Sequence, residues 1–223
     1  MNIEPRVVSK NERVFLTAAL SKGLRLDGRR DVDCRPLSVA FIDNGNCEVQ
    51  LGKTRVVCSI SAEGEPRQRA PAFCRLFFLL FLFSLLTREA AVVEPFPDRG
   101  NDGMYSFDVV LSPMGSSAFA KEAWTDESVE LCRIVERTLR DSNAIDTESL
   151  CILAGSKVWS IAVTLIVLDA AGNLVDACSA AALASLMHFR RPAVTVDASG
   201  KITKHSFEEQ DPAPLAIHHT PVT

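Results

Sequence analysis

This chain of 223 residues lacks several common sequence motifs of catalytic and cofactor-binding sites. It has no G-x-S-x-G nucleophile motif, no P-loop and no dinucleotide-binding glycine fingerprint. Its seven cysteines form no C-x-x-C pair, and its four histidines form no metal-ligand spacing, so no cofactor or metal is expected. The odd cysteine count and the lack of a signal peptide favour a reducing, intracellular compartment. Sparse glycine and proline (11 each) exclude a collagen-like or low-complexity chain.

Net charge excludes a uniformly basic binder of polyanions. The whole chain carries −4, but residues 1–35 hold eight Lys/Arg against five Asp/Glu, so the remainder carries −7. Any contact with a polyanion must therefore be a local patch rather than a global field.

One apolar run does not fit the rest of the pattern. Residues 72–86 are AFCRLFFLLFLFSLL, with eight consecutive Leu and Phe at 76–83. This run is far shorter than the ~20 residues that a membrane-spanning helix needs, and it has no amphipathic face. No stable membrane association is expected, although a membrane-touching segment stays open as an alternative.

The fold class predicted by periodicity is α+β. Ser9 and Glu12 have the spacing of a capping box, and Asp126 is placed to cap a second helix. Small residues in the last helix suit close packing on a sheet, and residues 157–168 resemble a central buried strand. We predict one mostly antiparallel sheet with helices on one side. The predicted elements are helices 9–23, 127–140 and 176–189, strands 37–41, 47–51, 55–62, 105–111, 150–154 and 157–168, and a hairpin over 195–203.

The second predicted helix carries the clearest candidate site. Arg133, Arg137 and Arg140 follow i, i+4, i+7 spacing, so they share one face and could track successive phosphates. The alternative is an ordinary solvated face on which Glu130 and Glu136 pair with them. His188 is expected to pack at a helix end rather than act as a base.

Several stretches together resemble the RNase PH family. They cover nearly the whole chain except residues 64–91, and two of them, IDTESL and HFRRP, point within that family to a ring subunit of the eukaryotic RNA exosome. The stretches are NER at 11–13, LRLDGR at 24–29, LGKTR at 51–55, IDTESL at 145–150, AGSKVW at 154–159, GNLVDA at 172–177 and HFRRP at 188–192.

The resemblance implies a β-α-β-α domain like the second domain of a small-subunit ribosomal protein, assembled into a hexameric ring. It implies RNA, other RNase PH-like ring subunits and cap subunits as partners. It further implies support of 3′-to-5′ RNA processing and degradation, including rRNA maturation and mRNA turnover, in the nucleus, nucleolus and cytoplasm.

The resemblance also implies a subunit without activity of its own. Active members hold phosphate with a Thr-Arg pair that aligns with Leu174 and Val175, and aliphatic side chains cannot donate hydrogen bonds to a dianion. Their acidic residues lie beyond Thr223. Arg133, Arg137 and Arg140 align with RNA-contacting positions, and so does Arg99. The alternatives are a phosphorolytic exoribonuclease and a truncated isoform that does not assemble.

The expected organisation has three parts. Residues 1–30 form an N-terminal helix and a basic turn, residues 31–203 an RNase PH-like domain, and residues 204–223 the extended start of a second subdomain that is missing. Segment 64–91 is an atypical insert in the second part. We interpret it as a translated intron or a gene-model error, with a genuine partner-binding or membrane-touching insert as the alternative.

Overall fold

The computed structural model describes residues 9–25, 28–30, 32–61, 91–95, 98–116, 119, 125–197, 202–205, 207 and 209–221. It divides into two compact units, Met1–Pro36 and Leu37–Thr223, which are described separately.

The first unit contains helix α1 (Lys10–Ser21). The hydroxyl of Ser9 accepts a hydrogen bond from the backbone N–H of Glu12 at 3.2 Å, so the predicted N-cap is confirmed. The chain turns away from the helix through Gly23, whose φ of +68° favours glycine.

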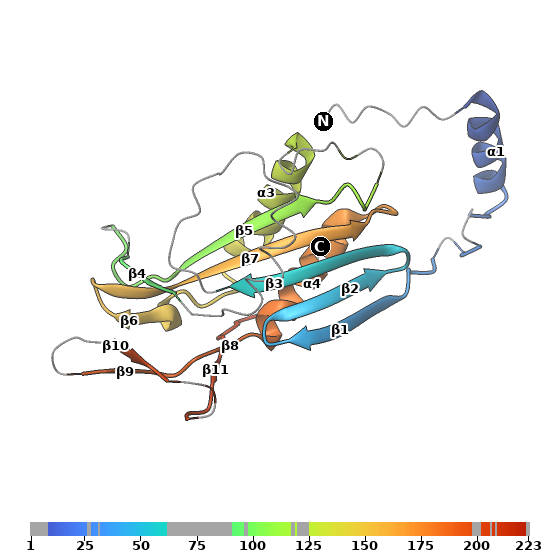
Figure 1. Cartoon of the computed structure of the whole chain (residues 1–223). Coiled ribbons are helices and arrows are strands. Elements are labelled where there is room, and N and C mark those ends of the chain that lie inside the picture. Colours follow the sequence, from blue (N-terminus) through green and yellow to red (C-terminus); the bar gives the residue numbers. More distant parts are fainter. Residues whose placement is uncertain are drawn as a thin grey trace. The chain divides into compact units, whose positions relative to one another are not determined.

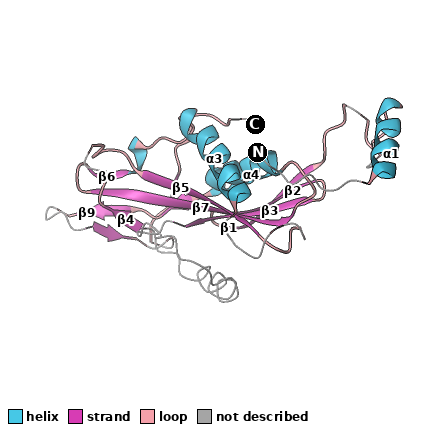
Figure 2. Ribbon diagram, turned by 90° about the horizontal axis from the view of Figure 1, so that it is seen from above, coloured by secondary structure: helices cyan, strands magenta, loops and turns pink. Residues whose placement is uncertain are grey.

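The second unit is a seven-stranded sheet with two helices on one face, which confirms the predicted α+β class (Figures 1 and 2). Only the β5–β7 pair is parallel within this sheet. Short strands β8 to β11 form two further ladders. The elements are β1 (Leu37–Asp43), β2 (Asn46–Leu51), β3 (Thr54–Ser61), β4 (Ala91–Val93), β5 (Met104–Leu111), α3 (Asp126–Asp141), a 3-10 turn (Glu148–Leu150), β6 (Cys151–Leu153), β7 (Lys157–Asp169), α4 (Leu174–His188), β8 (Arg190–Arg191), β9 (Val194–Val196), β10 (Ile202–Lys204) and β11 (Ala213–Pro214).

The core lies between the sheet and its two helices. Alternate residues of the central strand β7 are buried, and the alanine-rich side of α4 packs on β2 and β3. Small side chains let the helix backbone approach the sheet closely, as the sequence predicts. The residues buried at this interface include Val163, Leu165, Val167, Ala177 and Ala181.

Two helix starts differ from the prediction. Thr125, not Asp126, is the N-cap of α3, because its hydroxyl accepts from Ser128 N–H while the Ser128 hydroxyl accepts from Thr125 N–H. Helix α4 begins at Leu174, two residues before the predicted start, because Asn173 adopts a left-handed φ of +58° that ends the preceding turn.

Strands β3 and β4 lie in line on one edge of β7. Ser61 lies opposite Ala162, and Ala91 lies opposite Ser160, while β5 occupies the other edge of β7. The chain advances by 30 residues where the ladder advances by two, so the surplus is 28 residues, the length of segment 64–91. The two strands are thus in register as one strand with an insertion.

All of the insert 64–91 except Ala91, including the apolar run 76–83, lies outside the described part of the chain. The interpretation of the insert therefore stays a prediction. Within the described part, no helix is long and apolar enough to cross a bilayer.

We expect the thiols to differ sharply in reactivity. Cys34 is exposed, whereas burial raises the pKa of the Cys178 thiol to about 12 and also raises the pKa of Cys58. Alkylation at pH 8, followed by peptide mass spectrometry, should modify Cys34 more than about a thousandfold faster than either buried thiol, because these must await unfolding. Equal rates would contradict this packing, and denaturant should equalise them.

Candidate nucleic-acid interface

Helix α3 presents one buried face and one outward face. Ser128, Val135 and Leu139 are buried against the sheet. The Cys132 thiol also donates a hydrogen bond to the backbone carbonyl of Phe107 on β5 at 2.9 Å. These contacts fix the rotation of the helix about its axis, and so determine which side chains meet solvent.

The three predicted arginines all lie on the outward face of α3, as their spacing requires. Arg133 is exposed, and the side chains of Arg137 and Arg140 are 82% and 55% exposed. Exposure on one helix face is the geometry that contact with a phosphate backbone needs. Their contact with RNA remains a prediction.

The three guanidinium groups differ in how firmly they are held. Arg140 Nη2 lies 2.8 Å from Glu136 Oε1, and its guanidinium sits 5.2 Å above the ring of Tyr105 on β5. Arg137 Nε lies 3.8 Å from Asp141 Oδ2, which is a weak exposed pair. Arg133 has no ion pair within the described part of the chain. Arg140 is therefore the oriented member, and the other two can reorient toward a ligand.

Acidic residues interleave with Arg133, Arg137 and Arg140, which together form the stripe on α3. The alternative of a solvated, ion-paired face therefore retains support. Glu136 and Asp141 engage two of the three arginines, and Asp126 and Glu127 occupy the first turn. A phosphate backbone must replace these intrahelical pairs, each of which contributes only about 0.3–0.5 kcal/mol in water.

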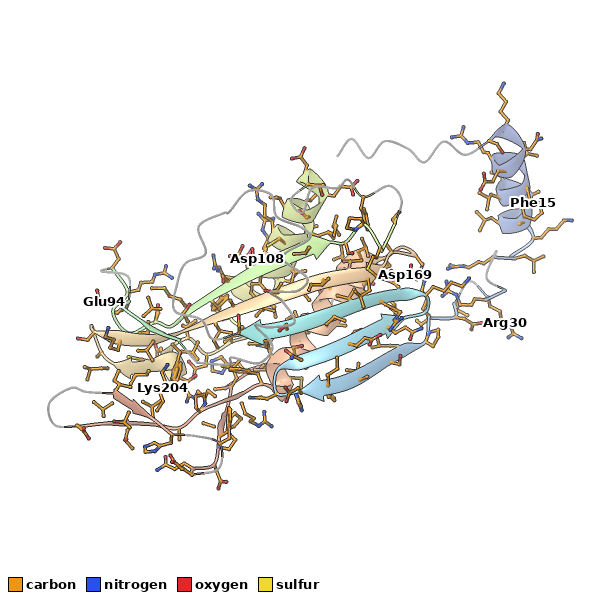
Figure 3. The ribbon with its side chains drawn as sticks, viewed as in Figure 1. Phe15, Arg30, Glu94, Asp108, Asp169 and Lys204 are labelled. Carbon is orange, nitrogen blue, oxygen red and sulfur yellow. The ribbon has the colours of Figure 1, made fainter. Side chains whose placement is uncertain are left out.

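Arg99 is not part of α3; it lies in the turn that precedes β5. Its carbonyl accepts a hydrogen bond from Asp102 N–H at 3.4 Å, and the neighbouring Gly100 carbonyl accepts from Gly155 N–H at 2.9 Å. Its side chain is exposed. Near this turn, Glu94 (labelled in Figure 3) lies 3.8 Å from the amine of Lys157.

The first turn of α4 is apolar and acidic. Leu174 and Val175 begin the helix, and the Asp176 carboxylate accepts a hydrogen bond from the Asn173 side chain. The Thr54 hydroxyl is occupied as well, because it donates to the Gly172 carbonyl at 2.7 Å. This turn therefore presents a carboxylate and two aliphatic side chains, which is unfavourable chemistry for a phosphate dianion.

The arginines of the HFRRP stretch have structural roles. The backbone N–H and C=O of Arg190 bond the side-chain amide of Asn44 at 2.7 and 2.8 Å. Arg191 donates to the Ser149 carbonyl, and burial lowers its pKa from the usual arginine value, an effect that Asp146 opposes. The Arg190 guanidinium also donates to the Met187 carbonyl at 2.9 Å and so fastens the end of α4, whereas Arg191 ties β8 to the 3-10 turn. Both guanidinium groups are therefore engaged within the fold.

Sequence reasoning missed two aromatic contacts. Tyr105 lies beneath Arg140, and Phe41 stacks on His188 with ring centroids 4.5 Å apart. The expectation that His188 packs at a helix end is confirmed. Both contacts join residues far apart in the chain, so no local pattern signals them.

Comparison with known proteins identifies the family of the chain. Residues 29–192 match the model of the 3′ exoribonuclease family, domain 1. The chain is 40% identical to the exosome complex component RRP45A of Arabidopsis thaliana over 95% of its own length and 61% of the relative's. It is likewise 40% identical to human exosome complex component RRP45, over 96% and 43%.

Among solved structures, the fold is similar to a chain from the Archaeoglobus fulgidus exosome with RNA bound to the active site. The TM-score is 0.67 at 26% identity, over 94% of this chain and 69% of that one. The chain thus spans about three fifths of the plant relative's length and about two fifths of the human relative's.

Proposed function

Because this chain belongs to the 3′ exoribonuclease (RNase PH) family, we propose that it is a non-catalytic, RNA-contacting ring subunit of an RNA exosome. The observation that carries the proposal is the outward row of Arg133, Arg137 and Arg140 on α3. Guanidinium groups spaced along one helix face suit successive phosphates, whatever the base sequence. Arg99 supplies a further exposed cation before β5.

Lack of phosphorolytic activity is the second part of the proposal. The first turn of α4 holds Leu174, Val175 and Asp176, so no side chain there donates hydrogen bonds to phosphate. The subunit would guide RNA, and another subunit would supply the nuclease.

The relatives named as exosome components support further parts of the proposal. The partners would be other RNase PH-like ring subunits, cap subunits and RNA. The role would be 3′-to-5′ RNA processing and decay, including rRNA maturation and mRNA turnover. The expected compartments are the nucleus, the nucleolus and the cytoplasm.

Reversing the charge of the three stripe arginines should weaken RNA binding by an assembled ring. In a ring containing the Arg133→Glu, Arg137→Glu, Arg140→Glu variant, each lost phosphate contact should reduce the log–log salt slope by about one. The measurement is RNA affinity at several salt concentrations, with ring assembly checked by mass.

The matched control reverses three exposed lysines elsewhere, at Lys22, Lys53 and Lys204. It introduces the same charge change, and should leave the salt slope nearly unchanged. Unchanged RNA protection by the arginine variant in an intact ring would refute the proposed contact. Phosphate-dependent release of nucleoside diphosphates by the purified chain would instead support a phosphorolytic enzyme.

A further inference from the structure

Strand β1 is an edge of the sheet, and no described strand pairs with its outer side. It pairs only with β2 among the described strands, and all seven of its residues are exposed. From Leu37 to Ile42 it contains no charged residue and no proline. Natural edge strands usually carry charged residues or proline, or lie beneath a helix or loop, and these features prevent pairing with another strand. An apolar edge strand without them is a site of strand pairing.

The apolar side chains of β1 lie on the face that α4 covers elsewhere. Val39 is opposite Val49, and Phe41 is opposite Cys47; these two β2 residues are fully buried. On β1, Leu37, Val39 and Phe41 remain 55%, 39% and 54% exposed.

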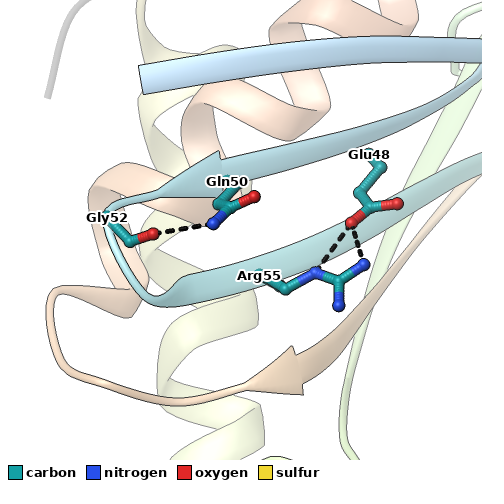
Figure 4. Close-up of polar contacts among 4 residues, drawn as sticks. All are labelled: Glu48, Gln50, Gly52 and Arg55. Carbon is teal, nitrogen blue, oxygen red and sulfur yellow. Dashed lines mark hydrogen bonds and ion pairs between the residues drawn. The ribbon is translucent and has the colours of Figure 1, made fainter. Parts of the chain in front are cut away.

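Helix α4 touches the edge strand through the stacking of His188 on Phe41, and its Met187 is also exposed. The opposite face of β2 and β3 is polar, with Arg55 Nε donating to Glu48 at 2.8 Å and the Gln50 amide donating to the Gly52 carbonyl at 2.9 Å (Figure 4). The unsatisfied apolar surface is therefore the α4 side of β1.

The same three β1 residues carry the free backbone groups. Ile60 N–H donates to the Gly45 carbonyl, so the odd-numbered residues of β2 bond β3. The even-numbered ones then bond β1 through Ser38 and Ala40. By this alternation, the N–H and C=O groups of residues 37, 39 and 41 point to the open edge.

We propose that β1 pairs antiparallel with β1 of a second copy of this chain, about a two-fold axis at Val39. Val39 then exchanges two hydrogen bonds with the partner's Val39, and Leu37 pairs with the partner's Phe41 in both directions.

The occupant follows from the chemistry of the strand. Apolar side chains and outward backbone groups coincide at residues 37, 39 and 41, and residues 37–42 carry no charge, so a second β1 sets apolar side chains opposite apolar side chains without bringing like charges together. The two sheets would then form one continuous sheet with both α4 helices on the same face. This self-pairing goes beyond the proposed ring role and does not depend on it.

The full chain should show reversible, concentration-dependent dimerisation by analytical ultracentrifugation. Val39→Pro removes a donor that faces the open edge while sparing the bonds to β2. Losing both Val39 hydrogen bonds should weaken the dimer about thirtyfold. Phe41→Lys is a second variant that places charge at the seam. Met114→Lys, at an exposed methionine outside β1, is the matched control and should dimerise normally.

Amide exchange tests the register without a substitution. In the dimer, the amides of Leu37, Val39 and Phe41 should gain protection as concentration rises, while those of Ser38 and Ala40 are protected throughout. A monomer at every concentration, or self-association that neither β1 variant weakens, would overturn the proposal. The proposal would also be overturned if the chain stayed monomeric and the Phe41→Lys substitution abolished only a complex with another ring subunit.

Discussion

Removing residues 64–91 is expected to raise the soluble yield severalfold and leave the sheet in register. The excision joins Glu63 to Val92, and Val92 already lies opposite Trp159 on β7. Glu63 then falls opposite Ser160, in line with the pairing of Ser61 with Ala162. The strand becomes continuous, and the excised segment takes with it eight consecutive large apolar residues, which are an aggregation hazard.

A deletion one residue shorter is the matched control. Removing residues 64–90 leaves Ala91 as an extra residue, which forces either a bulge or a one-residue slip that turns every following side chain to the other face. Soluble fraction and thermal midpoint should be compared for both deletions and the intact chain, each co-expressed with a neighbouring ring subunit. If the 28-residue deletion lowers solubility or abolishes an association that the intact chain makes, the segment is a genuine structural element.

Gly103→Ala is expected to destabilise the second unit by about 3 kcal/mol. A Cβ atom at this position would lie 2.2 Å from Leu150 Cβ, and Leu150 is fully buried. A contact between two Cβ atoms cannot be relieved by a rotamer change, so the backbone must move. The Gly103 N–H also donates to the Thr147 carbonyl at 2.9 Å, which ties the two segments together.

Thermal unfolding is the measurement for this substitution. A loss of about 3 kcal/mol corresponds to a midpoint lower by roughly 6–12 °C for a chain of this size. Gly100→Ala is the control, because its nearest neighbour would be the Gly155 Cα at 3.3 Å, a contact that small shifts relieve. Equal midpoints for the two variants would contradict the packing of Leu150 against Gly103.

The elements that sequence predicted well are those with a strong local period. Alternation from Tyr105 to Leu111 placed β5, and the apolar run of β7 marked it as the central strand. The arginine face of α3 followed from helical spacing alone. The contact of Arg140 with Tyr105 did not, since it depends on how α3 is rotated against β5.

Two further features depend on geometry that neighbouring residues do not encode. The continuity of β3 with β4 is a property of the shared β7 ladder, and the sequence pattern predicts a strand only at 55–62 and none at 91–93. The start of α4 at Leu174 depends on the left-handed backbone of Asn173, whereas the sequence pattern predicts a helix that begins at residue 176.

The central position of β7 also sets the order in which the sheet can form. Strands β1 and β2 form one hairpin and β2 and β3 form the next, so these strands can pair as soon as they leave the ribosome. Among the described strands, β4, β5 and β6 have no partner until β7 has been synthesised, because each of them pairs with β7. Long-range pairings of this kind form slowly and leave strand edges open meanwhile. A nascent chain halted before residue 157 would therefore hold a three-stranded meander and unpaired strands, a substrate for chaperones rather than a folded intermediate.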